Sequence, residues 1–188
     1  TRVAQTINSN AQLLDDPELI LNEIQGLTNS SWWIELKNES AAPLEVGGYA
    51  LSAAGDPLRE YTLPSQLVPV GGYIVISQAQ LGFTMEDEEP LFLYRPGKAS
   101  VADARTVEFS LRGKYEAAWL RPASATPGSV NHFELTDDIV INEIMYHHQA
   151  TNDGVTYAES EVEWVELYNR GNSTVSLDGW KFDDGISY

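Results

Sequence analysis

A six-residue segment near the start of the chain alternates between apolar and polar side chains. Within Trp33–Asn38, Ile34 and Leu36 alternate with charged residues, and the preceding Trp32 falls in the same phase as these two. Residues two apart in a β-strand lie on the same face of the sheet, so this pattern is typical of a half-buried strand. We therefore predict a β-strand here, with Trp32 on the face of Ile34 and Leu36.

The same segment returns later in the chain at an offset of 131 residues. An Asn-Glu-Ile triplet precedes each copy, and a glycine followed by an aromatic residue comes after it. The recurring residues are Asn22, Glu23, Trp33, Glu35, Asn38 and Gly48 in the first copy, and Asn142, Glu143, Trp164, Glu166, Asn169 and Gly179 in the second. The second copy has 11 extra residues between triplet and strand, where a loop tolerates added length. We predict an internal repeat of one structural unit.

The rest of the chain favours an all-β fold. Short β-rich runs, among them Leu19–Ile24, follow one another at spacings of about 10 residues with Gly and Pro turn signals between them. No segment has a sustained helical period, and 43% hydrophobic residues suffice for a packed core. The pattern predicts an antiparallel β-sandwich. The continuous apolar run at 73–76 predicts a strand buried on both faces in the middle of a sheet.

We expect three parts in the chain. Residues 1–18 are a polar leader or edge segment, 19–134 form a β-sandwich, and 135–188 form the N-terminal part of a second repeat. The second copy lacks counterparts of Leu58–Asn131, so we expect its free strand edges to pair with the first sandwich, with residues 1–18 or with another chain. The first residue is Thr1 rather than Met, which predicts a processed product.

The ordered motifs resemble the lamin tail domain family. They are Asn-Glu-Ile, then W-[IV]-E-L-x-N, then G-[YW], followed in the first unit by Thr62-Leu63-Pro64, Gly71-Gly72-Tyr73 and Thr126-Pro127-Gly128 with Asn131. The resemblance covers about residues 19–133 and again 138–188. It implies an immunoglobulin-like β-sandwich without catalytic residues. Bacterial members are similar to modules of secreted or surface-attached proteins, so an extracellular or cell-surface bacterial location is expected.

This resemblance implies a non-catalytic binding or adhesion module of a larger secreted or surface protein. The sequence does not identify its ligand, for which a protein and a carbohydrate are the two candidates. The alternative is an accessory or targeting domain attached to a downstream enzyme, such as a spore-coat-protein-H kinase-like domain. Intracellular scaffolding, as in lamins, is disfavoured because no heptad rod precedes the domain. We expect no enzyme activity, since the chain has no nucleotide fingerprint, phosphate-binding glycine loop or Ser-His-Asp arrangement.

Charge and composition exclude several classes of partner. The net charge is −17 and no cluster of Lys and Arg occurs, which argues against nucleic acid, because phosphate binding needs clustered basic residues. No apolar run approaches the ~18 residues of a membrane span, so membrane insertion is not expected. The chain has no cysteine and hence no disulfide.

The recurring glutamates are the first candidates for chemistry. Glu23 and Glu35 on neighbouring strands have the residue types of an acid and base pair. The structural alternative is favoured, because they recur together with Asn22 and Asn38, and such polar side chains hydrogen-bond strand ends and turns.

Metal ligands are a second possibility. His147 and His148, with Asp153 and Glu159, offer nitrogen and oxygen ligands for zinc, but neighbouring strand residues point to opposite faces. Calcium suits the oxygen-rich turns that contain Asn152 and Asp153, or Asp183 and Asp184, although neither has the spacing of an EF-hand loop. Surface turns are the preferred interpretation, and no cofactor is expected beyond calcium.

The candidates for ligand contact are Trp32 and, in the 11-residue insertion, His147 and His148. Trp33 aligns with Trp164 and is assigned to structure, whereas Trp32 aligns with Glu163, which leaves it free to stack on a sugar or a partner side chain. The alternative is that the leader or the second unit covers Trp32.

Overall fold

The computed structural model describes residues 17–27, 31–145, 151–152, 157–158, 164–178, 180 and 182. The chain divides into two compact units, Thr1–Glu134 and Leu135–Tyr188. Each unit is described by itself below.

One sheet of the first unit carries the recurring residues in its centre. It is antiparallel with the strand order β11-β10-β1-β2-β7. Its strands are β1 (Leu19–Ile24), β2 (Trp33–Asn38), β7 (Tyr73–Ser77), β10 (Arg112–Tyr115) and β11 (Ala118–Leu120). The predicted strands at 19–24 and 33–38 are confirmed.

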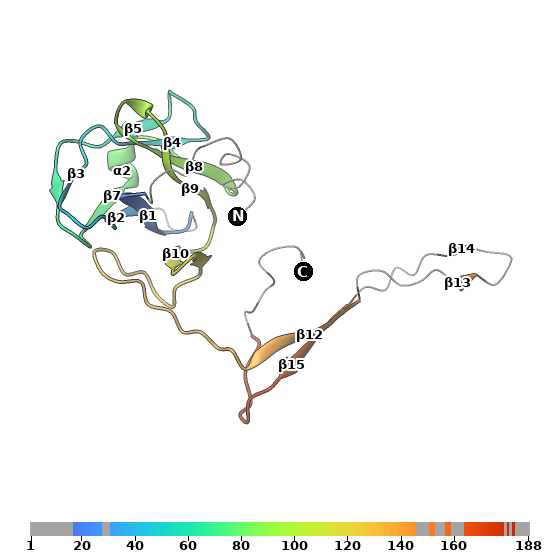
Figure 1. The fold of residues 1–188 in the computed structure, drawn as a ribbon. Helices are drawn as coiled ribbons and strands as arrows, with labels where there is room; N and C mark the ends of the chain where they lie inside the picture. Colours follow the sequence, from blue (N-terminus) through green and yellow to red (C-terminus); the bar gives the residue numbers. More distant parts are fainter. Residues whose placement is uncertain are drawn as a thin grey trace. The chain divides into compact units, whose positions relative to one another are not determined.

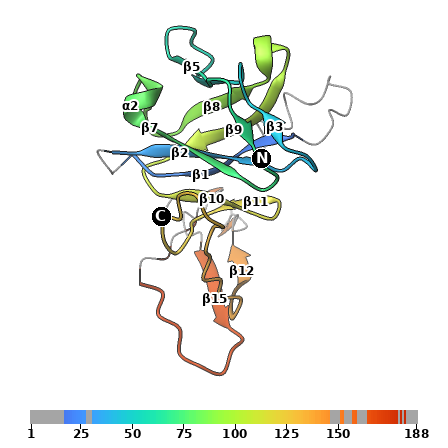
Figure 2. The same cartoon turned by 90° about the vertical axis from the view of Figure 1, so that its left-hand side faces the viewer.

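A second antiparallel sheet, with the order β5-β4-β8-β9, lies opposite the first (Figures 1 and 2). Its strands are β4 (Ala50–Ala53), β5 (Glu60–Thr62), β8 (Glu89–Tyr94) and β9 (Val101–Val107). The smaller elements are the pair β3 (Leu44–Glu45) and β6 (Leu67–Val68), the helix α2 (Gln78–Leu81) and the 3-10 turn η1 (Pro96–Lys98). The predicted immunoglobulin-like β-sandwich is confirmed.

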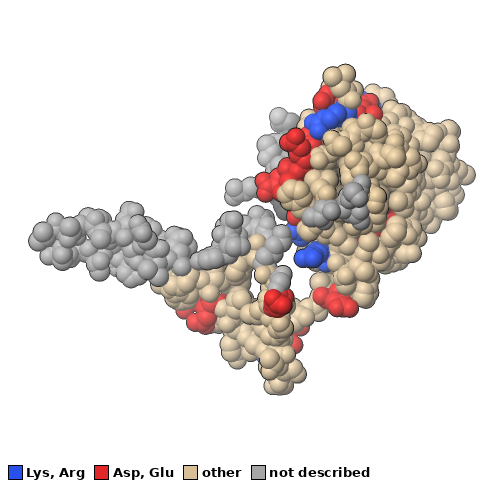
Figure 3. Space-filling view, turned by 180° about the vertical axis from the view of Figure 1, so that it is seen from behind, with Lys and Arg blue, Asp and Glu red and all other residues tan. Residues whose placement is uncertain are grey.

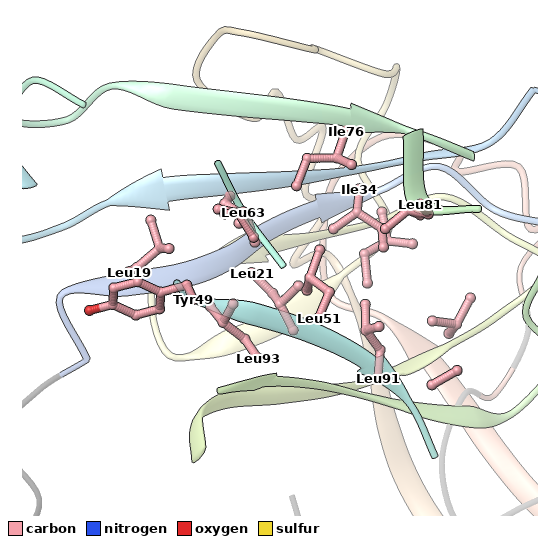
Figure 4. Close-up of a cluster of buried hydrophobic side chains, with 14 of the residues drawn as sticks. Leu19, Leu21, Ile34, Tyr49, Leu51, Leu63, Ile76, Leu81, Leu91 and Leu93 are labelled. Atoms are coloured by element: carbon pink, nitrogen blue, oxygen red, sulfur yellow. The ribbon is translucent and has the colours of Figure 1, made fainter. Parts of the chain in front are cut away.

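The hydrophobic core fills the space between these two sheets (Figure 4). Leu21 and Ile34 of the first sheet and Leu51, Leu91 and Leu93 of the second are all 0% exposed. Full burial of one such side chain is worth about 1.5–3 kcal/mol, so this apolar layer is the main source of stability.

The prediction for residues 73–76 is wrong in one respect. They form most of β7, but among the described residues β7 pairs only with β2 and is the edge strand of its sheet, and Val75 is 39% exposed. An apolar run has the same appearance in a central strand as in an edge strand that is covered on one face. The position in the sheet depends on strand pairing, which the run does not encode.

Helix α2 is too short to produce a periodic pattern. Its signals are local: the Ser77 hydroxyl accepts from the Gln80 N–H, the Gln80 side chain accepts from the Ser77 N–H, and Gly82 ends the helix with a φ of 74°. This is a capping box with a left-handed C-terminal glycine.

The described residues of the second unit form two antiparallel strand pairs (Figure 1). They are β12 (Ile139–Met145) with β15 (Trp164–Asn169), and β13 (Thr151–Asn152) with β14 (Tyr157–Ala158).

The β12–β15 pair has the register of the β1–β2 pair. Glu143 lies opposite Glu166, as Glu23 lies opposite Glu35, and a one-residue irregularity precedes Glu143 as it precedes Glu23. A bulge reverses the alternation of side chains along a strand. In both pairs it therefore determines which residues share the face of the glutamates.

Candidate functional site

The recurring polar residues of the first unit are buried. Glu23 and Glu35 are 0% exposed and Asn22 is 4% exposed, and the two carboxyl groups come from directly paired positions of β1 and β2. Glu35 follows Ile34 and precedes Leu36, which both pack into the core, so the glutamates project from the opposite face of the sheet.

A segment from a distant part of the chain closes over the two carboxyl groups. We call residues 126–131 the closing segment. The Thr126 N–H donates to the Glu23 carboxyl at 3.0 and 3.2 Å, and the Thr126 hydroxyl donates to it at 3.2 Å. The Gly128 N–H and the Asn22 amide donate to the two oxygens of Glu35, the latter at 2.7 Å. Each carboxyl oxygen therefore has a donor, as burial requires.

Asn131 completes the attachment of the closing segment. Its amide nitrogen donates to the carbonyls of Asn22 and Lys114, both at 3.0 Å, and its oxygen accepts from the Asn22 amide at 3.1 Å. Gly113 of β10 leaves the room for this side chain, because a Cβ at that position would lie 2.8 Å from the Asn131 amide nitrogen. Asn131 thus joins β1, β10 and the closing segment.

Replacement of Asn131 by alanine is expected to lower the free energy of unfolding by about 2 kcal/mol, because it leaves two backbone carbonyls and the Asn22 amide without this partner. Urea denaturation followed by far-UV circular dichroism measures the change. Ser129→Ala is the control, since Ser129 is exposed and its replacement should change the value by less than about 0.5 kcal/mol. Equal effects of the two substitutions would contradict a structural role for Asn131.

Asn38 performs a separate structural task at the end of β2. Its amide nitrogen donates to the carbonyls of Ala42, Val68 and Pro69 at 3.0–3.1 Å, and its oxygen accepts from the Ser40 N–H at 2.9 Å. The side chain therefore connects the turn after β2 with the end of β6.

Burial changes the acidity of the glutamate pair. It raises the pKa of the Glu23 carboxyl from 4.5 to about 7, opposed by the hydrogen bonds from Thr126 and assisted by the charge of Glu35. Burial likewise raises the pKa of Glu35. A general acid with such a pKa would suit catalysis, but a substrate has no access to either carboxyl group in this arrangement. The hydrogen bonds instead match the structural interpretation of these residues.

The counterparts in the second unit have the same internal contacts. Asn142 donates to Glu166, as Asn22 donates to Glu35. Asn169 donates to the Ser173 carbonyl at 2.8 Å and accepts from the Gly171 N–H at 2.9 Å, which parallels the contacts of Asn38.

In the part of the chain that the structure describes, the two units differ in whether a chain segment covers the glutamates. Asn142, Glu143 and Glu166 are exposed, and no backbone N–H among the described residues donates to either carboxylate. We refer to these three residues as the open acidic cluster.

The prediction that Trp32 is free for ligand contact is wrong. Trp32 is 3% exposed and belongs to the core cluster of the first unit, and its carbonyl accepts from the Gln78 N–H at 3.0 Å. Trp33 is the half-exposed member of the pair. The reason is the alternation itself, which places Trp32 on the face of Ile34 and Leu36, and core side chains cover it.

The remaining candidates fall largely outside the described residues. These are His147, His148, Asp153, Asp183, Asp184 and Gly179; for Asn152 only its place in β13 is described. Within the described part of the chain, no three His, Cys, Asp or Glu side chains are grouped so that they could hold a metal ion. The described residues therefore test neither the calcium sites nor the disfavoured zinc site.

Two contributors to the site were not recognised from the sequence. Thr126-Pro127-Gly128 is part of the recognised motif series, but the motif does not indicate that the Thr126 and Gly128 N–H groups donate to Glu23 and Glu35. These donors and acceptors are about 100 residues apart in the sequence. Asp103 of β9 had no signal at all: its carboxylate accepts from the Leu21 N–H at 3.0 Å, beside the bulge in β1.

The antiparallel β-sandwich of the first unit places this chain among immunoglobulin-like β proteins. Residues 134–188, which include the whole second unit, match the family model of the lamin tail domain. This domain is an immunoglobulin-like module that is usually non-catalytic. Comparison with curated proteins gave no match. In the described part of the chain, no helix has the length and apolar character needed to cross a membrane.

Proposed function

We propose that this chain is a non-catalytic protein-binding module with two units of the lamin tail type, the first closed and the second, in the residues that the structure describes, open. The observation that supports it most directly is the exposure of apolar side chains on β12 and β15. Ile141, Ile144 and Leu167 are 51%, 50% and 39% exposed. Contiguous exposed apolar surface on a folded unit is typical of interaction sites.

In the first unit, the residues at the equivalent positions are buried in the hydrophobic core. By register, the counterparts of Ile141, Ile144 and Leu167 are Leu21, Ile24 and Leu36, which are all at most 1% exposed. The same holds after the second strand, where Trp180 is 49% exposed while its counterpart Tyr49 is 4% exposed. The open unit thus presents residues of a core type to a partner. This comparison also supports the internal repeat, which we include in the proposal.

The surface charge fits a protein ligand better than a polyanion. On the face drawn in Figure 3, Lys and Arg side chains occur in separate small groups among Asp and Glu. Several basic groups are held in ion pairs, such as Lys114 with Glu39 and Arg112 with Glu108. That nucleic acid does not bind remains a prediction from net charge. The expectation of a carbohydrate ligand depended on an exposed Trp32 side chain, and Trp32 is buried.

Attachment to a larger secreted or surface protein of bacterial type is part of the proposal. It depends on the resemblance of the motifs to bacterial members of the family. The expected role in such a protein is to bind a partner polypeptide through the open face of the second unit.

Selection from a displayed peptide library against the immobilised full chain tests the proposal. We expect peptides that bind the wild type and lose binding to the variant Ile141→Lys, Leu167→Lys, because two charges in the apolar face oppose burial. Leu58→Lys is the control, since Leu58 is 92% exposed in the first unit and should not affect binding. Peptides that bind all three proteins equally, or a selection that enriches none, would refute the proposed role of this face.

A further inference from the structure

The strand edges and the acidic residues of the second unit are open together. In the first unit, β10 pairs with the outer edge of β1 and β7 with that of β2. Among the described residues, β12 and β15 pair only with each other. The edges that β10 and β7 occupy in the first unit therefore have no described strand in the second. Unpaired strand edges and their backbone groups are ready to bind another polypeptide segment.

The open acidic cluster lies on this strand pair, and its two carboxylates favour a partner that supplies hydrogen-bond donors. Glu143 and Glu166 lie directly opposite each other, and like charges in paired positions are destabilising. Donors that lie between them relieve this repulsion, and backbone N–H groups form strong hydrogen bonds to carboxylates. In the first unit this is how Glu23 and Glu35 are satisfied, by the Thr126 and Gly128 N–H groups.

We propose that the second unit binds a peptide segment of the Thr-Pro-Gly-x-x-Asn type, whose two turn N–H groups donate to Glu143 and Glu166 and whose Asn side chain contacts the backbone of β12. This inference depends on the proposed function, because it names a partner of the same strand pair, but its contacts lie on the face opposite to Ile141, Ile144 and Leu167. The contacts are those that the closing segment makes with Glu23, Glu35 and Asn22.

Charge complementarity supports this occupant. In a chain with 28 acidic residues, the stretch 121–133 (RPASATPGSVNHF) contains none and carries Arg121 and His132. A segment of this composition approaches the open acidic cluster without repulsion. The chain's own closing segment is already held by Glu23, Glu35 and Asn22, so the partner is a second segment of the same chemistry.

A synthetic peptide with the sequence of residues 121–133 and blocked ends, added to the uniformly ¹⁵N-labelled full chain, tests the proposal. We expect saturable shifts of the Asn142 side-chain amide and of backbone amides in β12 and β15. The matched control peptide carries N-methylglycine at position 128, which removes one N–H and no charge. It should bind about tenfold more weakly, the loss of one hydrogen bond to a charged group.

Two chain variants locate the site. Glu166→Ala should weaken binding of the unmodified peptide about tenfold, whereas Glu134→Ala, which removes another exposed charge, from the first unit, should leave it unchanged. Equal binding of the two peptides would mean that a cationic side chain is recognised instead, and would overturn the proposal. Shifts confined to the first unit, or no shifts at millimolar peptide, would also overturn it.

The two proposals fail in distinguishable ways. If library peptides bind the Ile141 and Leu167 face but the residue 121–133 peptide does not, the open face is a binding site for other partners and only the Thr-Pro-Gly inference is lost. If neither binds, both are lost.

Discussion

Replacement of Trp32 by alanine is expected to lower the free energy of unfolding by about 3–5 kcal/mol, the range for a tryptophan truncated inside a packed core. Trp32 is 3% exposed and belongs to the core of the first unit. Its removal leaves a cavity that the surrounding sheets cannot fill completely. Urea denaturation followed by far-UV circular dichroism measures the change without depending on tryptophan fluorescence.

Trp33→Ala provides the matched control. The two residues are neighbours of the same type, but Trp33 is half-buried and lies outside the core cluster. Its replacement should cost about 1–2 kcal/mol, in proportion to the smaller apolar area removed from water. A larger loss for Trp33→Ala than for Trp32→Ala would contradict the assignment of Trp32 to the core.

The second large effect is on pH dependence. Glu23 has a pKa of about 7 in the folded protein and 4.5 as its ordinary value, so the folded state binds more protons between these two values. Its contribution to stability is therefore fully present below about pH 4.5 and is lost as the pH rises through about 7. Burial of Glu35 acts in the same direction. We expect the free energy of unfolding to fall by roughly 3 kcal/mol over this range.

Glu23→Gln isolates this contribution. Glutamine retains an oxygen that accepts from Thr126 but does not ionise, so the difference between variant and wild type should move in favour of the variant as the pH rises. Urea denaturation at several values between pH 4.5 and about 8 gives this difference directly. A difference that is flat with pH would show that Glu23 does not titrate in this range.

The difference curve is needed because other carboxylates act in the opposite direction. Hydrogen bonds and ion pairs lower the pKa of Glu39 and Glu89, through Lys114 and Arg59 respectively. Their stabilisation is present above their unfolded pKa and is lost as the pH falls through the folded value. Both effects occur in wild type and variant, and they cancel in the comparison when the sites are far apart.

The strands that contain the recurring sequence motif were the most predictable part of the fold. The alternation at 33–38 correctly placed Trp32 with Ile34 and Leu36, because side-chain direction in a strand is a local property. The error about its exposure came from comparing the two copies of the motif, in which Trp32 aligns with Glu163 rather than with a second tryptophan. The place of β7 at the sheet edge was not predictable from its apolar run, because pairing depends on segments elsewhere in the chain.

The candidate site was predictable in its residue types but not in its partners. Recurrence of the Asn and Glu residues indicated a structural role, and the hydrogen bonds of Asn22 and Glu35 agree with it. The donors that satisfy Glu23 and Glu35 lie 103 and 93 residues further along the chain. Nothing in a local pattern identifies which distant backbone N–H will cover a carboxylate.

The sequence by itself determined that Leu19–Ile24 and Trp33–Asn38 form strands and that Trp32 shares the face of Ile34 and Leu36, because alternation is a property of neighbouring residues, whereas the register and the bulge came from the structure. Only the tertiary structure decided what those strands do. The same motif is buried where the closing segment and the second sheet cover it, and exposed in β12 and β15. Burial is a property of whatever packs on a strand, and for this reason one motif serves as the core of one unit and as the proposed binding surface of the other.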